Sequence, residues 1–171
     1  GDGGGGEGEG DDGRVYVAEV LVKGVVDTAA SAVELRVAVV GNVDSGKSTL
    51  IGVLTKGGLD NGRGLKRLDV FRHKHEVANG RTSSVSTHVV GFDEGGDIIN
   101  YHGVHGMSAA EVAHTATRLV SLIDLAGHDR YFKTTVFGLT GHVPAYACLA
   151  LGANTGVQRM TKEHLGVALA L

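Results

Sequence analysis

The chain has 171 residues, of which 16 are Lys or Arg and 19 are Asp or Glu. This length suits one α/β domain, and the near balance of charges indicates no particular class of partner. The single cysteine, Cys148, excludes an internal disulfide and fits a reducing compartment. No segment approaches the roughly 20 apolar residues that a membrane span needs, so we expect a cytoplasmic protein with no membrane partner.

The first part of the chain predicts a tail, a hairpin and a helix, in that order. Residues 1–14 are eight glycines, five acids and one arginine, with no apolar side chain to bury, so we expect them to be disordered. Residues 15–22 and 31–40 are rich in β-forming residues and predict an N-terminal β-hairpin that leads into the first core strand. A helix follows Lys47 and fades by Gly57.

The rest of the chain alternates strands with helices after one long irregular stretch. Residues 60–86 show little periodicity, several glycines and many basic residues, which predicts a mobile loop, and a loop of this length usually has a function. The later elements are a hairpin of Thr87–Phe92 and Asp97–Tyr101, a helix over Ala109–Thr117 with Ser108 and Glu111 as its capping box, strands Leu119–Ile123 and Tyr146–Leu151, and a helix over Thr161–Leu171. This alternation predicts an α/β fold with a mainly parallel sheet.

The most informative motif is Gly41–Ser48, whose sequence GNVDSGKS matches G-x-x-x-x-G-K-[ST], the phosphate loop of P-loop NTPases. Its glycines allow a tight turn that points backbone N–H groups at phosphates, and the next helix presents its positive N-terminus to them. Lys47 can reach the β- and γ-phosphate oxygens, and the Ser48 hydroxyl can bind Mg²⁺. A plain glycine turn is disfavoured, because the motif lies between a buried-strand pattern and a helical run. The expected nucleotide contacts are Asn42, Val43, Asp44, Ser45, Gly46, Lys47, Ser48 and Thr49.

Two further segments predict phosphate and metal contacts. Asp124 follows a buried strand, where α/β ligand sites form, and its carboxylate can hold Mg²⁺ directly or through water. Three residues later, the Gly127 N–H can contact a γ-phosphate with no Cβ in the way. In the long loop, Thr82 is a candidate switch residue, which would bind Mg²⁺ when the γ-phosphate is present. The rival hydroxyls nearby are Ser83, Ser84, Ser86 and Thr87.

These residues resemble the translational GTPases of the elongation factor Tu type and, within that group, the GTP-binding protein 1 family. The similar blocks are VAVVGNVDSGKSTL (37–50), LDNGRG (59–64), FRHKHE (71–76), GRTSSV (80–85), LIDLAGH (122–128), KTTVFGLTGH (133–142) and MTKEHLGVALAL (160–171). The resemblance implies a Ras-like G domain that binds GTP and hydrolyses it with Mg²⁺. It also implies Thr82 as the switch threonine, Asp124 as the second metal-site residue and His128 as the residue that orients the attacking water.

His128 and Arg81 can also be judged by chemistry. An imidazole just after Gly127 could reach an in-line water, and phosphoryl transfer needs positioning more than a strong base. The alternative is a polar residue that caps the next turn. The family places an apolar residue directly before the switch threonine, where it walls off the histidine, but Arg81 stands there in this chain and only Val43 supplies the other half. A solvated Arg81 is favoured over one that leans toward the phosphates.

Guanine specificity normally comes from an [NT]-K-x-D motif, and no K-x-D occurs in this chain. The residues themselves therefore predict triphosphate and Mg²⁺ chemistry, and guanine is implied by the resemblance. We expect residues 15–171 to be a partial, C-terminally truncated G domain that lacks this strand and the family's downstream β-barrels. The strand Tyr146–Leu151 would then be an apolar, unpaired edge.

The expected partners are a guanine nucleotide and, through the full-length protein, the ribosome, tRNA or other RNA. Basic residues between Arg63 and Arg81 could contact RNA phosphates, although a solvated switch loop is favoured. Two other functions stay open. One is another P-loop NTPase, such as a sulfate-activation GTPase. The other is a truncated fragment that binds nucleotide weakly or not at all.

Overall fold

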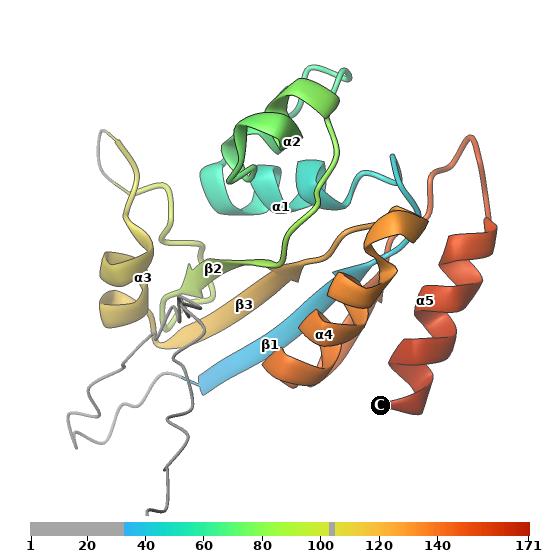
Figure 1. Ribbon diagram of the computed structural model, residues 1–171. Helices are drawn as coiled ribbons and strands as arrows, with labels where there is room; N and C mark the ends of the chain where they lie inside the picture. Colours follow the sequence, from blue (N-terminus) through green and yellow to red (C-terminus); the bar gives the residue numbers. More distant parts are fainter. Residues whose placement is uncertain (1–32, 103–104) are drawn as a thin grey trace, which may run out of the picture.

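The computed structural model describes residues 33–102 and 105–171, and its centre is a four-stranded sheet with the strand order β2-β3-β1-β4 (Figure 1). The strands are β1 (Val33–Val40), β2 (Ser86–Phe92), β3 (Arg118–Asp124) and β4 (Tyr146–Leu149). β1 pairs in parallel with β3 and β4, and β2 is antiparallel to β3. The predicted α/β fold with a mainly parallel sheet is confirmed. The predicted tail (1–14) and the first strand of the predicted hairpin (15–22) lie outside the described residues.

Helices cover both faces of the sheet (Figure 1). Helix α1 (Lys47–Lys56) packs on one face, with η1 (Leu65–Asp69) and α2 (Lys74–Asn79) on its outer side. The other face carries α4 (Phe132–His142) and α5 (Arg159–Ala170). The remaining helical elements are α3 (Ala109–Thr115), which lies near β2, and η2 (Asp129–Tyr131), which precedes α4.

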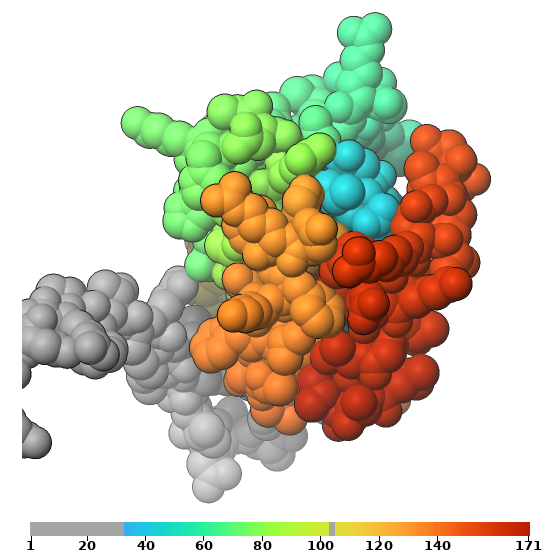
Figure 2. All heavy atoms as spheres, turned by 45° about the vertical axis from the view of Figure 1, so that its right-hand side comes forward, coloured from blue at the N-terminus to red at the C-terminus, as the bar shows by residue number. Residues whose placement is uncertain are grey.

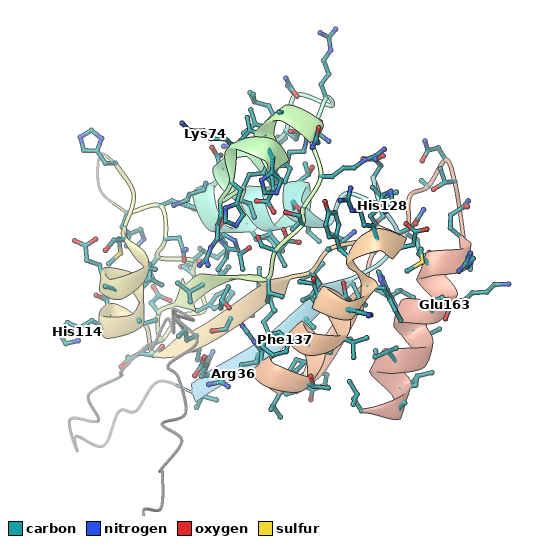
Figure 3. The ribbon with its side chains drawn as sticks, in the orientation of Figure 1. Arg36, Lys74, His114, His128, Phe137 and Glu163 are labelled. Atoms are coloured by element: carbon teal, nitrogen blue, oxygen red, sulfur yellow. The ribbon has the colours of Figure 1, made fainter. Side chains whose placement is uncertain are left out.

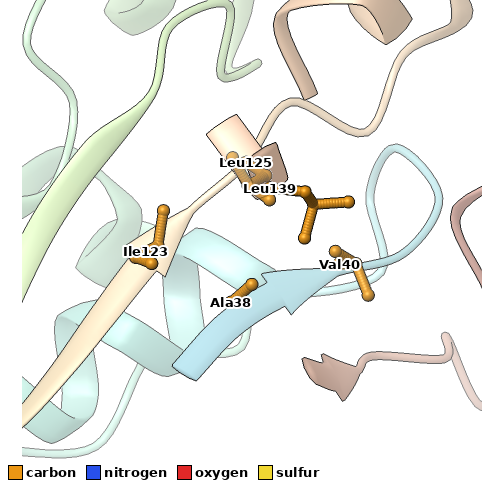
Figure 4. Close-up of a cluster of buried hydrophobic side chains, with 5 residues drawn as sticks. All are labelled: Ala38, Val40, Ile123, Leu125 and Leu139. Carbon is orange, nitrogen blue, oxygen red and sulfur yellow. The ribbon is translucent and has the colours of Figure 1, made fainter. Parts of the chain in front are cut away.

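Strand β1 joins the two packed layers because its side chains alternate between the faces. Ala38 and Val40 pack with buried residues of β3 and α4; Figure 4 shows this cluster, which also holds Ile123, Leu125 and Leu139. Val39 points to the other face and packs with Ile51 of α1 and Leu122 of β3. Burial of each such side chain contributes about 1.5–3 kcal/mol. The end of β1, where the glycine-rich loop starts, is therefore held from both sides.

Parallel pairing brings the ends of the strands together at one edge. Val39 pairs with Asp124, and Val40 pairs with Leu149. The residues that follow β1, β3 and β4 therefore emerge at the same edge of the sheet, where α/β ligand sites form. β4 lies at the end of the strand order within the described residues, as expected, and Tyr146 on it is 65% exposed.

The predicted hairpin after residue 86 is wrong in its second half. Asp97–Tyr101 forms no strand, and only one bridge joins Ile98 to Phe92. The side chain of Asn100 extends this short backbone pairing, which includes the bond from Ile99 N to Gly91 O (3.0 Å): its Oδ1 accepts from Gly91 N (2.8 Å), and its Nδ2 donates to Val89 O (2.8 Å). An amide side chain supplies one donor and one acceptor in the same way that a strand residue does.

The predicted irregular loop 60–86 is also wrong in part, since it contains η1 and α2. These elements are too short for a helical period to be visible in the sequence. Helix α4 was not predicted, because its sequence FKTTVFGLTGH contains Gly138, Gly141 and three threonines, all poor helix formers. Tertiary packing overrides that preference: a Cβ on Gly138 would collide with Leu125, so the glycine lets α4 approach the end of β3 closely.

The helix after residue 108 begins as predicted. Ser108 Oγ accepts from Glu111 N (3.3 Å), and Glu111 Oε2 accepts from Ser108 N (2.7 Å), which completes the capping box. In the part of the chain that the structure describes, no helix combines the length and apolar character needed to cross a lipid bilayer.

Candidate nucleotide-binding site

The glycine-rich loop leaves β1 and turns tightly into α1. Gly41 (φ 143°) and Gly46 (φ 89°) adopt backbone conformations that favour glycine, and Asp44 is left-handed as well (φ 58°). Gly46 is the N-cap of α1, and its carbonyl accepts from Leu50 N at 2.8 Å. The loop therefore surrounds the positive end of a ten-residue helix, where unpaired backbone N–H groups favour an anion.

Lys47 supplies the positive charge of this loop. Its side chain is 6% exposed, and Nζ donates to Gly41 O (3.0 Å) and Asn42 O (2.7 Å). Burial lowers the pKa of Lys47 to about 8, while the carboxylates of Asp124 and Asp44 partly oppose the shift. The amine is therefore still mainly protonated at pH 7. A buried, desolvated ammonium attracts a phosphate more strongly than an exposed one does.

Three oxygen-bearing side chains from three elements meet beside Lys47. Ser48 Oγ lies 2.7 Å from Thr82 Oγ1 and donates to Asp124 Oδ2 at 2.7 Å. Thr82 Oγ1 donates to the same Oδ2 at 3.3 Å. Ser48 comes from the start of α1, Thr82 from the loop before β2, and Asp124 from the end of β3. We call Ser48, Thr82 and Asp124 the oxygen cluster.

The carboxylate of Asp124 has an unusual environment. The residue is fully buried, and its Oδ1 has no hydrogen-bond partner within the described residues. Burial raises the pKa of Asp124 to about 6, although the hydrogen bond from Ser48 and the Lys47 ammonium oppose this. Two hydroxyls beside a carboxylate with an unpartnered buried oxygen suit a hard divalent cation such as Mg²⁺, which takes oxygen ligands. The donor set therefore fits the metal that the sequence predicts.

Three of the four rival hydroxyls near Thr82 have other partners, and the fourth, Thr87, is exposed. Ser83 and Ser84 donate to Glu76, and Ser86 Oγ lies 2.9 Å from His88 Nε2. Among the candidate hydroxyl side chains for the switch residue, all of which lie in the described part of the chain, Thr82 is the one that contacts Ser48 and Asp124.

The segment after Asp124 passes directly beside the glycine-rich loop. A Cβ on Gly127 would collide with Lys47 Nζ and lie 2.7 Å from the carbonyl oxygen of Asn42, so this close approach requires glycine. The side chain of His128, the next residue, is 34% exposed. Figure 3 shows His128 at the end of the molecule where the loop before α1 and the start of α4 come together.

The Nδ1 atom of His128 has two polar neighbours. Asp129 Oδ1 lies 2.6 Å from it, and Arg130 N lies 3.2 Å from it. Arg130 N also donates to Asp129 Oδ1 at 2.7 Å. The carboxylate favours a proton on Nδ1, which leaves Nε2 as the nitrogen that can accept from water. The capping role belongs to the other tautomer, in which Nδ1 carries no proton and accepts from Arg130 N at the start of η2.

A hollow collects most of the predicted site residues. It is lined by Val43, Asp44, Gly46, Lys47, Ser48, Thr49, Arg67, Phe71, Gly80, Arg81, Thr82, Gly127 and His128. The other predicted residues lie behind this lining: Asn42 and Ser45 bond within the loop, and Asp124 lies beneath Ser48. Figure 2 shows the loop region (blue-cyan) at the surface, between the green segment before β2 and the red segment before α5.

Sequence reasoning missed three residues of this lining, Arg67, Phe71 and Gly80. Phe71 belongs to the FRHKHE block, and its place in that family-like block was the sequence signal that could have indicated it. Its position beside the glycine-rich loop depends on the packing of η1 on α1. Arg81 is exposed and lines the hollow, and it also lines a neighbouring one with His75, Asn79, His128, Arg130 and Tyr131. An apolar wall is therefore not formed at this position.

A glycine loop around a helix N-terminus, a buried lysine and an oxygen cluster at the carboxyl edge of a parallel sheet define a P-loop nucleotide-binding domain. A family model described as the elongation factor Tu GTP binding domain matches residues 34–171. The chain belongs to this family, as the resemblance above implied.

Individual relatives agree with this assignment. The chain is 56% identical to GTP-binding protein 1 of Xenopus laevis over 140 residues, which are 81% of this chain and 21% of that protein. It is 52% identical to GTP-binding protein 2 of Mus musculus over 155 residues, 91% of this chain and 25% of that protein. The chain therefore spans a fifth to a quarter of the length of these curated relatives.

A solved structure, a bacterial selenocysteine-specific elongation factor, shares the fold. The TM-score is 0.54 at 24% sequence identity, over 79% of this chain and 17% of that one. The family model and the curated relatives make the chain a GTP binding domain of the elongation factor Tu type, and the solved structure agrees with that fold. They do not favour the sulfate-activation enzyme or the non-binding fragment as alternatives.

Proposed function

We propose that this domain binds GTP together with Mg²⁺ and hydrolyses the bond between its β- and γ-phosphates. The observation that carries the proposal is the oxygen cluster, in which Ser48, Thr82 and Asp124 lie within hydrogen-bond distance of one another beside the buried Lys47. A Ras-like switch needs this arrangement, because residues from the phosphate loop, the loop before β2 and the end of β3 would hold the metal together.

The phosphates are bound by the glycine-rich loop. Backbone N–H groups of residues 42–49 at the start of α1 face the anion, and Lys47 contacts the β- and γ-phosphate oxygens. The N–H of Gly127 contacts the γ-phosphate from the other side. Because the fold already holds each donor in place, the donors need little rearrangement when negative charge develops on the phosphates during the reaction.

Ser48, Thr82 and Asp124 are the residues that would hold Mg²⁺. When bound, the ion neutralises charge on the phosphate oxygens. Asp124 contributes its carboxylate, either directly or through water, and Ser48 contributes its hydroxyl. Thr82 contributes only when the γ-phosphate is present, so the segment from residue 60 to 86 differs in order between the triphosphate and diphosphate states.

His128 orients the attacking water. With Asp129 beside Nδ1, the Nε2 atom accepts a hydrogen bond from a water that attacks the γ-phosphorus. As the water oxygen bonds to the γ-phosphorus, the bond from that phosphorus to the β–γ bridging oxygen breaks, a proton of the water passes to the released phosphate, and GDP and inorganic phosphate leave. The exposed position of Arg81 means that the water is not shielded by an apolar side chain at this position.

The proposed partners and cellular compartment are taken from the family. In the full-length protein we propose a cytoplasmic GTPase that acts on the ribosome, tRNA or other RNA, with the basic stretch 63–81 facing RNA phosphates. Guanine is inferred from the family, since no K-x-D occurs in these residues.

Two serines at helix starts provide the test. Ser48 belongs to the oxygen cluster, whereas Ser108 caps α3, where its Oγ accepts from Glu111 N (3.3 Å). A fluorescent GTP analogue is titrated with excess Mg²⁺ and with EDTA. The parent and Ser108→Ala should bind more tightly with Mg²⁺, and Ser48→Ala should lose most of that difference. A parent that binds equally well in EDTA would contradict the proposal.

A further inference from the structure

Glu76 is a buried carboxylate that the phosphate chemistry does not use. It lies on α2 and is 1% exposed. Burial of a charged group is costly unless hydrogen bonds compensate for the lost water. The contacts of Glu76 therefore indicate what the residue does.

Its two oxygens bind two different parts of the chain. Oε2 accepts from the backbone N–H groups of Arg72 and His73, both at 3.1 Å, and so fixes the start of α2. Oε1 accepts from Ser83 N (2.7 Å), Ser83 Oγ (2.9 Å), Ser84 N (3.1 Å) and Ser84 Oγ (3.1 Å). One carboxylate thus joins the beginning of the helix to the chain that returns after it.

The returning chain is the part that carries Thr82. Gly80 ends α2 with a left-handed turn (φ 65°), and only Arg81 separates it from Thr82. Ser83 follows Thr82 directly and is held by Glu76. On its other side, Thr82 Oγ1 lies 2.7 Å from Ser48 Oγ. Thr82 therefore lies between Ser83, which Glu76 holds, and the other two residues of the oxygen cluster.

An anion is required for this set of contacts. All six partners are donors, and a carboxylate has acceptor sites on both oxygens. Burial alone would raise the pKa of Glu76, but hydrogen bonds from Ser83, His73 and Arg72 outweigh it and lower the pKa to about 2. A glutamine would turn an NH₂ group toward N–H donors at one end and lose those bonds.

We propose that Glu76 is the positioning residue for Thr82: it holds the threonine at Ser48 and Asp124 and thereby sets how strongly the domain prefers a triphosphate to a diphosphate. The inference rests on the proposed function, in which Thr82 meets the metal only when the γ-phosphate is present. Glu76 itself touches neither nucleotide nor metal.

The test is a double-mutant cycle on the discrimination ratio, defined as the Kd for GDP divided by the Kd for a non-hydrolysable GTP analogue, both in excess Mg²⁺. Glu76→Gln should lower this ratio roughly tenfold or more, since hydrogen bonds to a charged group are lost. Thr82→Ala should lower it as well. The double variant should match Thr82→Ala alone, because Glu76 acts through Thr82.

The matched control is Glu111→Gln. Glu111 occupies the same capping-box position on α3, where it accepts from Ser108 N (2.7 Å), and its side chain bonds to no residue other than Ser108 in the described part of the chain. Its substitution should leave the ratio unchanged. If Glu76→Gln fails to fold, as judged by circular dichroism and GDP binding, the variant Ser83→Ala/Ser84→Ala removes two of the six donors and should lower the ratio less, in the same direction.

The outcomes separate the two proposals. A parent with no Mg²⁺-dependent preference for the triphosphate contradicts the proposed function and, with it, this inference. A parent whose preference is lost in Thr82→Ala but kept in Glu76→Gln overturns the inference alone. Additive losses in the double variant also overturn it, because Glu76 would then act by a route independent of Thr82.

Discussion

Replacement of Lys47 by alanine gives the largest expected loss of nucleotide binding. In the free protein its ammonium is already desolvated, with 6% of the side chain exposed. The usual cost of stripping water from a lysine is therefore largely present before the nucleotide arrives, and more of the phosphate contact appears as affinity. Hydrogen bonds to charged groups contribute about 1.5–3 kcal/mol each.

Lys47 is expected to contact oxygens of two phosphates, so loss of both contacts amounts to roughly 3–6 kcal/mol, or about 10²–10⁴-fold in Kd. The assay is titration with a fluorescent GTP analogue in excess Mg²⁺. Lys56→Ala is the matched control, because Lys56 ends the same helix and is exposed. Circular dichroism checks the fold, since Lys47 also donates to Gly41 O and Asn42 O. A Lys47→Ala variant that folds and binds within threefold of the parent would refute the reasoning.

Three further predictions follow from the site and the sheet. His128→Ala should bind GTP within a few fold of the parent but hydrolyse it on the order of 10²-fold more slowly in single-turnover assays, and an unchanged rate would leave His128 as a cap only. Thr82→Ala should weaken triphosphate binding more than diphosphate binding, and equal losses would point to another hydroxyl. His88 is held neutral because burial, with Arg72 and Lys56 nearby, lowers its pKa to about 4, below its unfolded value of about 6.5. The stabilisation that depends on neutral His88 is therefore lost as pH falls from about 6.5 to 4. In denaturant titrations, the free energy of unfolding of His88→Gln should rise by about 3 kcal/mol relative to that of the parent between pH 7 and pH 4. Free energies of unfolding that change with pH in parallel in the two proteins would exclude this.

The phosphate loop could be predicted from sequence because its chemistry depends on local spacing. The turn can wrap around a helix N-terminus only if Gly41, Gly46 and Lys47 are spaced at fixed intervals. The spacing in the sequence therefore indicates the conformation of the loop. Asp124 was predictable for a related reason, since a carboxylate at the end of a buried strand lies at the carboxyl edge of the sheet.

Contacts between distant segments could not be predicted in this way. The burial of Glu76 depends on the reversal of chain direction after Gly80. Residues 60–86 show no periodic pattern that would predict this reversal. Asn100 likewise looked like a strand residue, but its side chain bonds to the backbone of β2 beyond the single bridge between the two segments. In both cases a single polar side chain organises a neighbouring segment, and hydrophobic periodicity carries no signal of that.

The choice of Thr82 among several hydroxyls required the resemblance to a known family. Geometry now gives a physical reason for it. Ser83 and Ser84 donate to Glu76, whereas Thr82 faces Ser48 and Asp124.

Release of inorganic phosphate from GTP under single-turnover conditions tests the central claim most directly. The account predicts that the chain releases phosphate with Mg²⁺, that EDTA stops the release, and that Ser48→Ala reduces it strongly while Ser108→Ala does not. Release that persists in EDTA, or that is the same in Ser48→Ala as in the parent, would contradict the assignment of the oxygen cluster as the centre of the reaction.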